Sequence, residues 1–232
     1  MEITYIHHSS FVVREQLHSG QKIALLFDYF EGTLPEFEPD IHLYVFASHK
    51  HADHFNLCIF ELWKKYKHVT YILGNDIKLN DKYLERNGIN ARVKDCIVTA
   101  KSHVEIELQD LTVETLRSTD QGVAFVVTFD GRTIYHAGDL NWWHWKGYTD
   151  NGNRIMGERY RQEIDRLIGR HIDVAFIPTD PRLEEFYDLG IKYFIEKVGA
   201  DIIYPMHLWD HYETAERLAQ EYPCVKNVVK LR

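Results

Sequence analysis

The chain has 232 residues, and 45% of them are hydrophobic, which is enough for a sizeable buried core. Asp and Glu (35) outnumber Lys and Arg (27), and the formal net charge of −8 disfavours nucleic acid as a partner because its phosphates would be repelled. The three cysteines are widely spaced, which argues against a disulfide framework. No basic N-terminal segment precedes an apolar run, and no apolar stretch reaches about 18 residues. We therefore expect a cytoplasmic globular protein.

The first part of the chain has the short apolar runs typical of β-strands. Residues 43–47 are apolar throughout, which predicts a buried strand. Asp130-Gly131 lies between two such runs and predicts a hairpin turn. Helical spacing of apolar residues interrupts the pattern at 57–67 and 77–87. The expected strands are residues 3–7, 11–14, 22–27, 43–47, 69–73, 92–98, 104–108, 111–116, 123–129 and 133–135.

The last third of the chain alternates between helical and strand patterns. Helices are expected near residues 156–168, 183–198 and 213–222, and strands at 174–177, 202–204 and 225–229. There is no linker, low-complexity tract or repeat, so we expect one domain over residues 1–232. Two sheets packed together with helices outside would satisfy this order of elements.

Four potential metal ligands lie within six residues directly after the strand predicted at 43–47: His49, His51, Asp53 and His54. In an extended segment, residues two apart face the same way, so His49 and His51 could point at one metal. Asp53 and His54 are adjacent and need a tight turn, which the small Ala52 tolerates. Imidazole and carboxylate are good ligands for zinc and similar ions. The alternative is a solvated polar loop that happens to be rich in histidine.

Two later strands end in the same manner. Asp139 follows the strand at 133–135 through Gly138, and its carboxylate could bridge two metals. His207 follows the strand at 202–204 and is a candidate terminal ligand. His211 lies four residues further on and is expected on an exposed face.

Together these residues resemble the metallo-β-lactamase superfamily, and the resemblance covers nearly the whole chain. The runs IHHSSF, LLFDYF and HAGDLN resemble most the branch that contains ascorbate-6-phosphate lactonase. The resemblance implies an α+β fold, an αββα four-layer sandwich of two mixed β-sheets with helices outside. It also implies that His49 and His51 bind a first metal and that Asp53, His54 and His207 bind a second. Asp139 would bridge the two metals.

The sequence departs from the family at one ligand. The family usually supplies a further histidine to the first metal just before the strand that corresponds to 123–129, where this chain reads RSTDQG. Asp120 is the best substitute, and the alternative is that Asp120 only caps the turn before Gly122. His8, a candidate for the substrate pocket, or His144 could also fill the gap. The cofactor is expected to be one or two divalent ions, most simply Zn²⁺, with Mn²⁺ or Fe²⁺ as alternatives.

Two further segments are expected at the pocket. Residues 141–145 (NWWHW) follow Asp139, and Trp145 and His144 could contact a substrate or belong to a packed lid. Asp180 and Arg182 follow another strand, and Arg182 could bind a carboxylate or phosphate. A structural contact between Asp180 and Arg182 is the alternative.

The sequence therefore predicts hydrolysis of a small ester, lactone or phosphodiester by a metal-bound hydroxide. Asp53 would orient the attacking water and accept its proton, and His144 is a candidate general acid. A serine nucleophile and an NTPase are disfavoured, because neither G-x-S-x-G nor G-x-x-x-x-G-K-[ST] is present. One alternative is a non-catalytic metal-binding or scaffold protein, for which the missing histidine is the main support. A di-iron redox protein is a minor alternative, because the related di-iron branch has Glu where this chain has His51.

Overall fold

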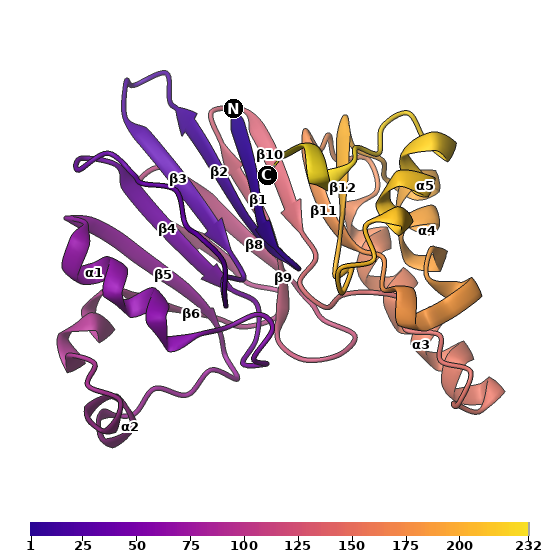
Figure 1. Ribbon diagram of the computed structural model, residues 1–232, viewed down its shortest axis with the longest axis horizontal. Coiled ribbons are helices and arrows are strands. Elements are labelled where there is room, and N and C mark those ends of the chain that lie inside the picture. The colour runs from indigo at the N-terminus through magenta and orange to yellow at the C-terminus, as the bar shows by residue number, and fades with distance from the viewer. Residues whose placement is uncertain (232) are drawn as a thin grey trace. The chain divides into compact units, whose positions relative to one another are not determined.

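The computed structural model describes residues 1–231. The chain forms two compact units, Met1–Lys101 and Ser102 onward, each built on one six-stranded mixed sheet (Figure 1). The two mixed sheets with their helices confirm the predicted fold class. The expectation of a single domain over residues 1–232 stays a prediction. Among the described helices, none combines the length and the apolar character needed to cross a membrane.

The sheet of the first unit has the strand order β1-β2-β3-β4-β5-β6. Its first three strands are antiparallel neighbours, and β3 to β6 run parallel. The strands are β1 (Glu2–His7), β2 (Ser10–Gln16), β3 (Lys22–Phe27), β4 (His42–Ala47), β5 (His68–Gly74) and β6 (Ile97–Ala100). The helices are α1 (Leu62–Lys65) and α2 (Asp81–Arg86), with 3₁₀ turns at Leu57–Glu61 and Ala91–Cys96.

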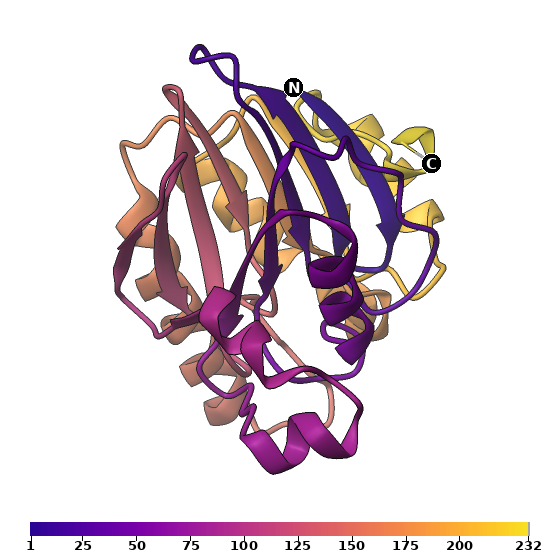
Figure 2. The ribbon, with the colours of Figure 1, turned by 90° about the vertical axis from the view of Figure 1, so that its left-hand side faces the viewer.

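The core of the first unit lies between one face of this sheet and the helical segments, which Figure 2 shows in purple and magenta. Leu26 of β3 and Val45 of β4 pack with Phe60 and Leu84 of those segments. All residues of β4 after His42 are buried, which confirms the prediction from its apolar run.

The sheet of the second unit has the order β12-β11-β10-β9-β8-β7, antiparallel from β7 to β10 and parallel from β10 to β12. Its strands are β7 (Glu105–Glu107), β8 (Thr112–Arg117), β9 (Val123–Phe129), β10 (Arg132–His136), β11 (Val174–Pro178) and β12 (Ile202–Met206). Its helices are α3 (Asp150–Ile164), α4 (Leu189–Lys197) and α5 (Glu213–Glu221), with 3₁₀ turns at Asp165–Leu167, Pro181–Phe186 and Val228–Leu231. Tyr135 of β10 stacks on Phe194 of α4, with ring centroids 5.4 Å apart.

Several predicted elements differ in the structure. Residues 92–96, expected as a strand, form a 3₁₀ turn, and the predicted strand at 225–229 is reduced to one bridge, between Val225 and Ile203. The helix expected at 57–67 divides into the 3₁₀ turn Leu57–Glu61 and the short helix α1. The one expected at 183–198 is broken by a 3₁₀ turn that starts at Pro181 and contains Glu184 at φ +55°. Apolar spacing cannot separate these short helical forms, because they share nearly the same periodicity.

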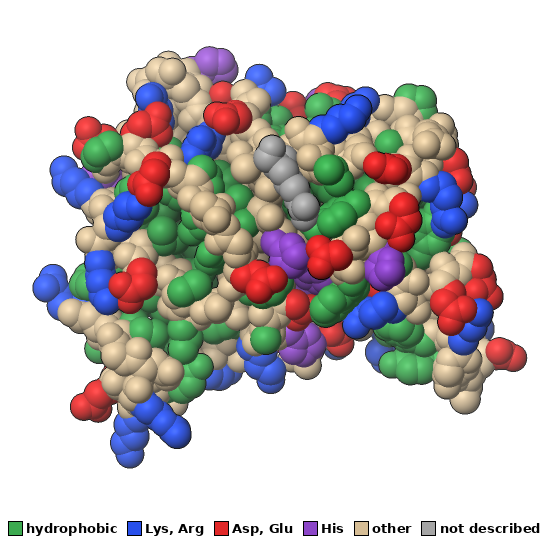
Figure 3. Space-filling model, viewed as in Figure 1, with side chains coloured by type: hydrophobic (Ala, Val, Ile, Leu, Met, Phe, Trp, Pro, Cys, Tyr) green, Lys and Arg blue, Asp and Glu red, His purple; other side chains and the backbone are tan. Residues whose placement is uncertain are grey.

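Charged side chains of both signs lie interspersed on the face shown in Figure 3. Many are paired, such as Lys65 with Glu36 at 2.7 Å and Arg170 with Glu114. Exposed ion pairs of this kind contribute little to the stability of the fold, because water and salt screen their charges.

Candidate metal centre

In the first unit, the candidate ligands follow the parallel strands β3 and β4, whose carboxyl ends meet at the same edge of the sheet. Asp28 follows β3, and His49, His51, Asp53 and His54 follow β4. The backbone N–H of His54 donates to the carbonyl of His51 at 3.0 Å. This is the tight turn that the adjacent Asp53 and His54 require. His49 and His54 are fully buried, and His51 is half-buried.

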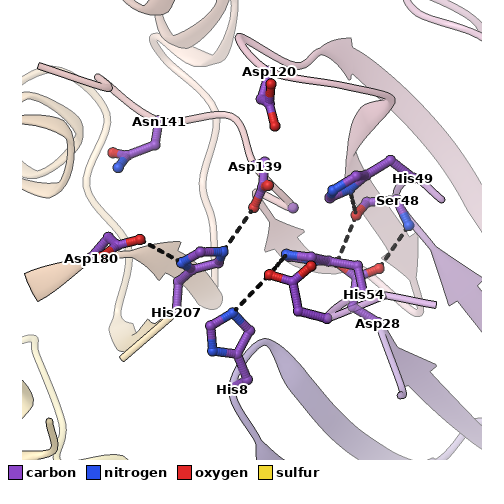
Figure 4. Close-up of polar contacts among 12 residues, drawn as sticks. His8, Asp28, Ser48, His49, His54, Asp120, Asp139, Asn141, Asp180 and His207 are labelled. Carbon is purple, nitrogen blue, oxygen red and sulfur yellow. Dashed lines mark hydrogen bonds and ion pairs between the residues drawn. The ribbon is translucent and has the colours of Figure 1, made fainter. Parts of the chain in front are cut away.

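A buried network orients two of these imidazoles (Figure 4). Asp28 accepts hydrogen bonds from the backbone N–H and the hydroxyl of Ser48, both at 2.7 Å. The Asp28 carboxylate also lies 2.8 Å from Nδ1 of His54, and the Ser48 hydroxyl lies 2.9 Å from Nδ1 of His49. Because the hydroxyl proton goes to Asp28, Ser48 accepts from His49, and both histidines carry their proton on Nδ1. Each Nε2 is then the basic nitrogen, as a metal ligand requires.

On the Nε2 side of His54 lies a cluster with His8 and Asp53. Oδ2 of Asp53 is 3.5 Å from Nε2 of His8 and 3.8 Å from Nε2 of His54. Bonds of 2.0–2.1 Å to a tetrahedral zinc place neighbouring ligand atoms about 3.3 Å apart, so separations slightly above this fit a divalent ion. The rings of His49 and His51 are also neighbours, with centroids 4.5 Å apart.

In the second unit, three candidates follow strands of the other sheet: Asp120 after β8, Asp139 after β10 and His207 after β12. Nε2 of His207 lies 3.4 Å from Oδ1 of Asp139, and both residues are buried (Figure 4). Asp120 is exposed, and one of its carboxylate oxygens lies within 4.8 Å of one of Asp139. Two carboxylates this close repel each other, and a bound cation would relieve the repulsion.

Thr119 holds the loops of Asp120 and Asp139 together. Its hydroxyl accepts from the backbone N–H of Asn141 at 3.0 Å and donates to the carbonyl of Asn141 at 2.6 Å. The turn around Asp120 is closed by Ser118, whose hydroxyl accepts from the Asp120 N–H at 3.1 Å. The side chain of Asp120 remains a candidate metal ligand, with capping of the turn before Gly122 as the alternative.

Asp180, which follows β11, is fully buried and orients His207. Its Oδ2 lies 2.9 Å from Nδ1 of His207, which again directs Nε2 toward Asp139. The same carboxylate binds the guanidinium of Arg182, so the structural contact considered for this pair is present. Burial alone would raise the pKa of Asp180. The hydrogen bonds from His207 and Arg182 outweigh burial and lower that pKa to about 2, so the carboxylate stays ionised.

The aromatic segment after Asp139 divides into packing and supporting residues. Trp142 packs against α3, with the Arg161 guanidinium 4.7 Å from its ring centroid. Trp143 donates from Nε1 to the Asp139 carbonyl at 3.0 Å, and its ring stands edge-on to His207. Trp145 is half-buried and stacks on Trp143.

Two further histidines of the second unit, His144 and His211, each contact a neighbouring side chain. The ring of His144 lies against Phe186, with centroids 3.9 Å apart. His211 is exposed, as expected, and pairs with Glu213 at 3.0 Å.

Sequence reasoning missed the orienting residues Asp28, Ser48 and Thr119. It also missed Trp209, whose Nε1 donates to Asp180 at 3.2 Å. Asp28 had a usable signal, because it follows a buried strand directly, as His207 does. Ser48 and Thr119 had none, because a hydroxyl beside a ligand motif is common in any loop.

The donor sets of both units consist of imidazole nitrogens and carboxylate oxygens, with the Nδ1 atoms of His49, His54 and His207 bonded to buried oxygens. This chemistry suits Zn²⁺, Mn²⁺ or Fe²⁺. Fold and donor sets together define a metal-binding protein with two mixed sheets. A family model described as "Beta-lactamase superfamily domain" matches residues 2–144, more than half of the chain, so the chain belongs to this superfamily.

Curated relatives match over nearly their full length. A protein of Methanospirillum hungatei is 28% identical over 95% of this chain and 87% of its own length. One of Methanocorpusculum labreanum is 27% identical over 100% and 92%. Both are named metal-dependent hydrolases.

Solved structures share the fold. A putative metal-dependent hydrolase from Parabacteroides distasonis is 17% identical, with a TM-score of 0.56 over 94% of this chain and 88% of that one. CmlA, a diiron β-hydroxylase from Streptomyces venezuelae, is 13% identical, with a TM-score of 0.55 over 99% of this chain and 49% of that one. At these identities the likeness concerns the fold alone.

Proposed function

We propose that this protein is a metal-dependent hydrolase that cleaves a small ester, lactone or phosphodiester. The observation that carries the proposal is the way the imidazoles are held within each unit. Nδ1 of His54 and Nδ1 of His207 each lie within hydrogen-bonding distance of a buried carboxylate, and each Nε2 faces another carboxylate, at 3.8 and 3.4 Å. Metal-binding histidines are held in this manner.

Proposed ligands lie in each of the two units. They are His49, His51, Asp53, His54, Asp120, Asp139 and His207. His8 is a further candidate, because its Nε2 lies beside the Asp53 carboxylate. Zn²⁺ is the proposed ion because imidazole and carboxylate donors are typical of its hydrolytic sites.

A bound divalent ion supplies a water of lowered pKa and a positive charge that stabilises the transition state. Asp53 is 24% exposed and lies between His8 and His54, so it is the proposed acceptor of the water's proton. Asp28 and Asp180 keep the imidazoles of His54 and His207 in the required tautomer. His144 is the proposed general acid for the leaving group.

Two considerations support an ester or lactone as the first substrate to test. The curated relatives carry the name metal-dependent hydrolase, and the runs IHHSSF and HAGDLN resemble the lactonase branch. A phosphodiester is the second choice because a metal pair can also clamp the oxygens of a phosphoryl group.

The deciding experiment is elemental analysis of the purified protein and of Asp120→Ala, together with turnover on a panel of lactones and phosphodiesters. We expect about two ions per chain in the wild type and about one in Asp120→Ala. Loss of a residue that only orients a metal ligand usually lowers activity by roughly 10- to 100-fold. We expect His49→Ala, which removes a proposed ligand itself, to lower activity by at least this much. His18→Ala is the matched control, because His18 is exposed in the turn between β2 and β3.

Other outcomes are equally informative. One ion in both proteins would leave Asp120 outside the metal site. Bound metal without turnover on any member of the panel would support the non-catalytic alternative.

A further inference from the structure

The guanidinium of Arg182 is held rigidly beside the candidate ligand His207. Its Nε lies 2.9 and 3.0 Å from the two oxygens of Asp180, and its Nη2 bonds to the same carboxylate. Asp180 is fully buried, and its Oδ2 also contacts Nδ1 of His207. The Arg182 side chain nevertheless remains 48% exposed, so part of it can meet a ligand.

Two indoles flank this guanidinium. Its carbon lies 4.4 Å from the ring centroid of Trp209 and 5.7 Å from that of Trp145, within the roughly 6 Å range of cation–π contacts. Trp209 is itself fixed, because its Nε1 donates to Asp180 at 3.2 Å. Trp145 is fixed by stacking on Trp143. The arginine therefore has little freedom left to lose when a ligand binds.

A purely structural role as counterion of Asp180 does not account for all of these contacts. Asp180 also contacts the Nδ1 atom of His207 and accepts from Trp209, so its charge is shared among several donors. Glu184 and Glu185, which follow in the chain, both pair with Lys146. An exposed and well-fixed guanidinium, with its planar set of N–H donors, can recognise a carboxylate or a phosphate.

We infer that Arg182, Trp145 and Trp209 form a subsite for an oxyanion group, a carboxylate or a phosphate, carried by the substrate. The inference rests on the proposed hydrolase function, and it narrows the substrate to an anionic ester or lactone. Arg182 would bind the anion through N–H donors other than those that bond to Asp180, and the indoles would cover an apolar part of the same molecule. Asp180 contacts both Arg182 and Nδ1 of His207, so the subsite lies beside this candidate ligand.

The test is a titration of the purified, metal-containing protein with inorganic phosphate and with acetate, followed by tryptophan fluorescence. We expect saturable binding of at least one anion, and the anion that binds more tightly identifies the preferred group. Arg182→Gln should weaken this binding by about tenfold or more, because a hydrogen-bonded charge is lost. Arg182→Lys should weaken it less, because the charge remains but the fork does not.

Arg161→Gln is the matched control, because Arg161 also lies over a tryptophan, Trp142, in the same unit. This variant should bind the anion within about twofold of the wild type, the change expected of an unrelated surface site. Equal affinity in wild type, Arg182→Gln and Arg182→Lys would overturn the inference, as would no saturable binding of either anion. If Arg182→Gln does not fold, the Arg182→Lys comparison decides alone.

Metal content separates this inference from the function on which it rests. Arg182→Gln should retain the metal of the wild type, so a selective loss of anion affinity supports the subsite. If Arg182→Gln kept its metal, its turnover and its anion affinity, the subsite would be excluded and the hydrolase function would not.

Discussion

His54 and His207 are held alike, although they follow strands of different sheets. In each case a buried carboxylate that follows a neighbouring strand contacts Nδ1, Asp28 for His54 and Asp180 for His207. An ionised carboxylate accepts the Nδ1 proton and so leaves Nε2 as the ligand atom. The same contact fixes the ring orientation, which removes entropy that metal binding would otherwise cost.

We predict that Asp28→Asn weakens metal binding by about 10- to 100-fold, which is the usual cost of losing a residue that orients a metal ligand. Asp28 has a φ of +43°, which asparagine tolerates, so the backbone should be preserved. The amide nitrogen, however, cannot accept from Ser48 or His54. Competition with a chelator measures the effect, and Asp40→Asn, at an exposed turn, is the control. Equal metal affinity in both variants would contradict the role given to Asp28.

Among the elements, α4 begins unusually close to the loop that carries Asp139. A Cβ on Gly190, the second residue of α4, would lie 2.1 Å from Oδ1 of Asn141. Asn141 is buried, and its backbone is bonded to Thr119 on the loop of Asp120. The absence of a side chain at Gly190 therefore lets the helix close over the loop without moving the two candidate ligands.

We accordingly expect Gly190→Ala to destabilise the protein by about 1–3 kcal/mol, the usual cost of overpacking, and to weaken metal binding as well. Gly147→Ala is the matched control, because no other atom lies within 4 Å of its added Cβ. Urea unfolding of both variants measures the difference in free energy. A Gly190→Ala variant as stable as Gly147→Ala would show that Asn141 can move freely.

Over the whole molecule, ligand candidates gather after parallel strands in both units. In the first unit they follow β3 and β4, and in the second they follow β10 and β12. Carboxyl ends of parallel strands meet at one edge of a sheet, which is where side chains can converge on a ligand. A metal bound by these candidates would stabilise the folded state, because the unfolded chain does not hold such a site.

We predict that a chelator lowers the Tm of the wild type by about 5–10 °C. A metal present at 100 times its Kd stabilises the folded state by roughly 2.7 kcal/mol. Each kcal/mol of stability corresponds to about 2–4 °C in Tm. His49→Ala and His207→Ala, one in each unit, should each reduce this shift, because each removes a proposed ligand. Calorimetry with and without chelator measures it. An unchanged shift in both variants would contradict the role of these histidines as metal ligands.

The amino-acid sequence by itself determined most strands and the positions of the candidate ligands. Residues 22–27 and 123–129 form strands with the predicted bounds, because their apolar runs are long and end at turn residues. The predicted Asp130-Gly131 turn has φ of +46° and +77°, as a tight hairpin requires. Residues 92–96 and 225–229 were less predictable, because their apolar content resembles that of a strand. The first segment forms a 3₁₀ turn, and the second pairs with a neighbouring strand only at Val225.

The contacts around those ligands were decided only by the tertiary structure. Ser48 connects His49 to Asp28, and Thr119 joins the loops of Asp120 and Asp139. Both connections depend on pairs of residues that lie about 20 positions apart in the chain. The rigid Arg182 between Trp145 and Trp209 likewise joins three separate loops. Local periodicity reports only which residues are buried, whereas hydrogen bonds and ring contacts depend on which strand ends the sheet brings together.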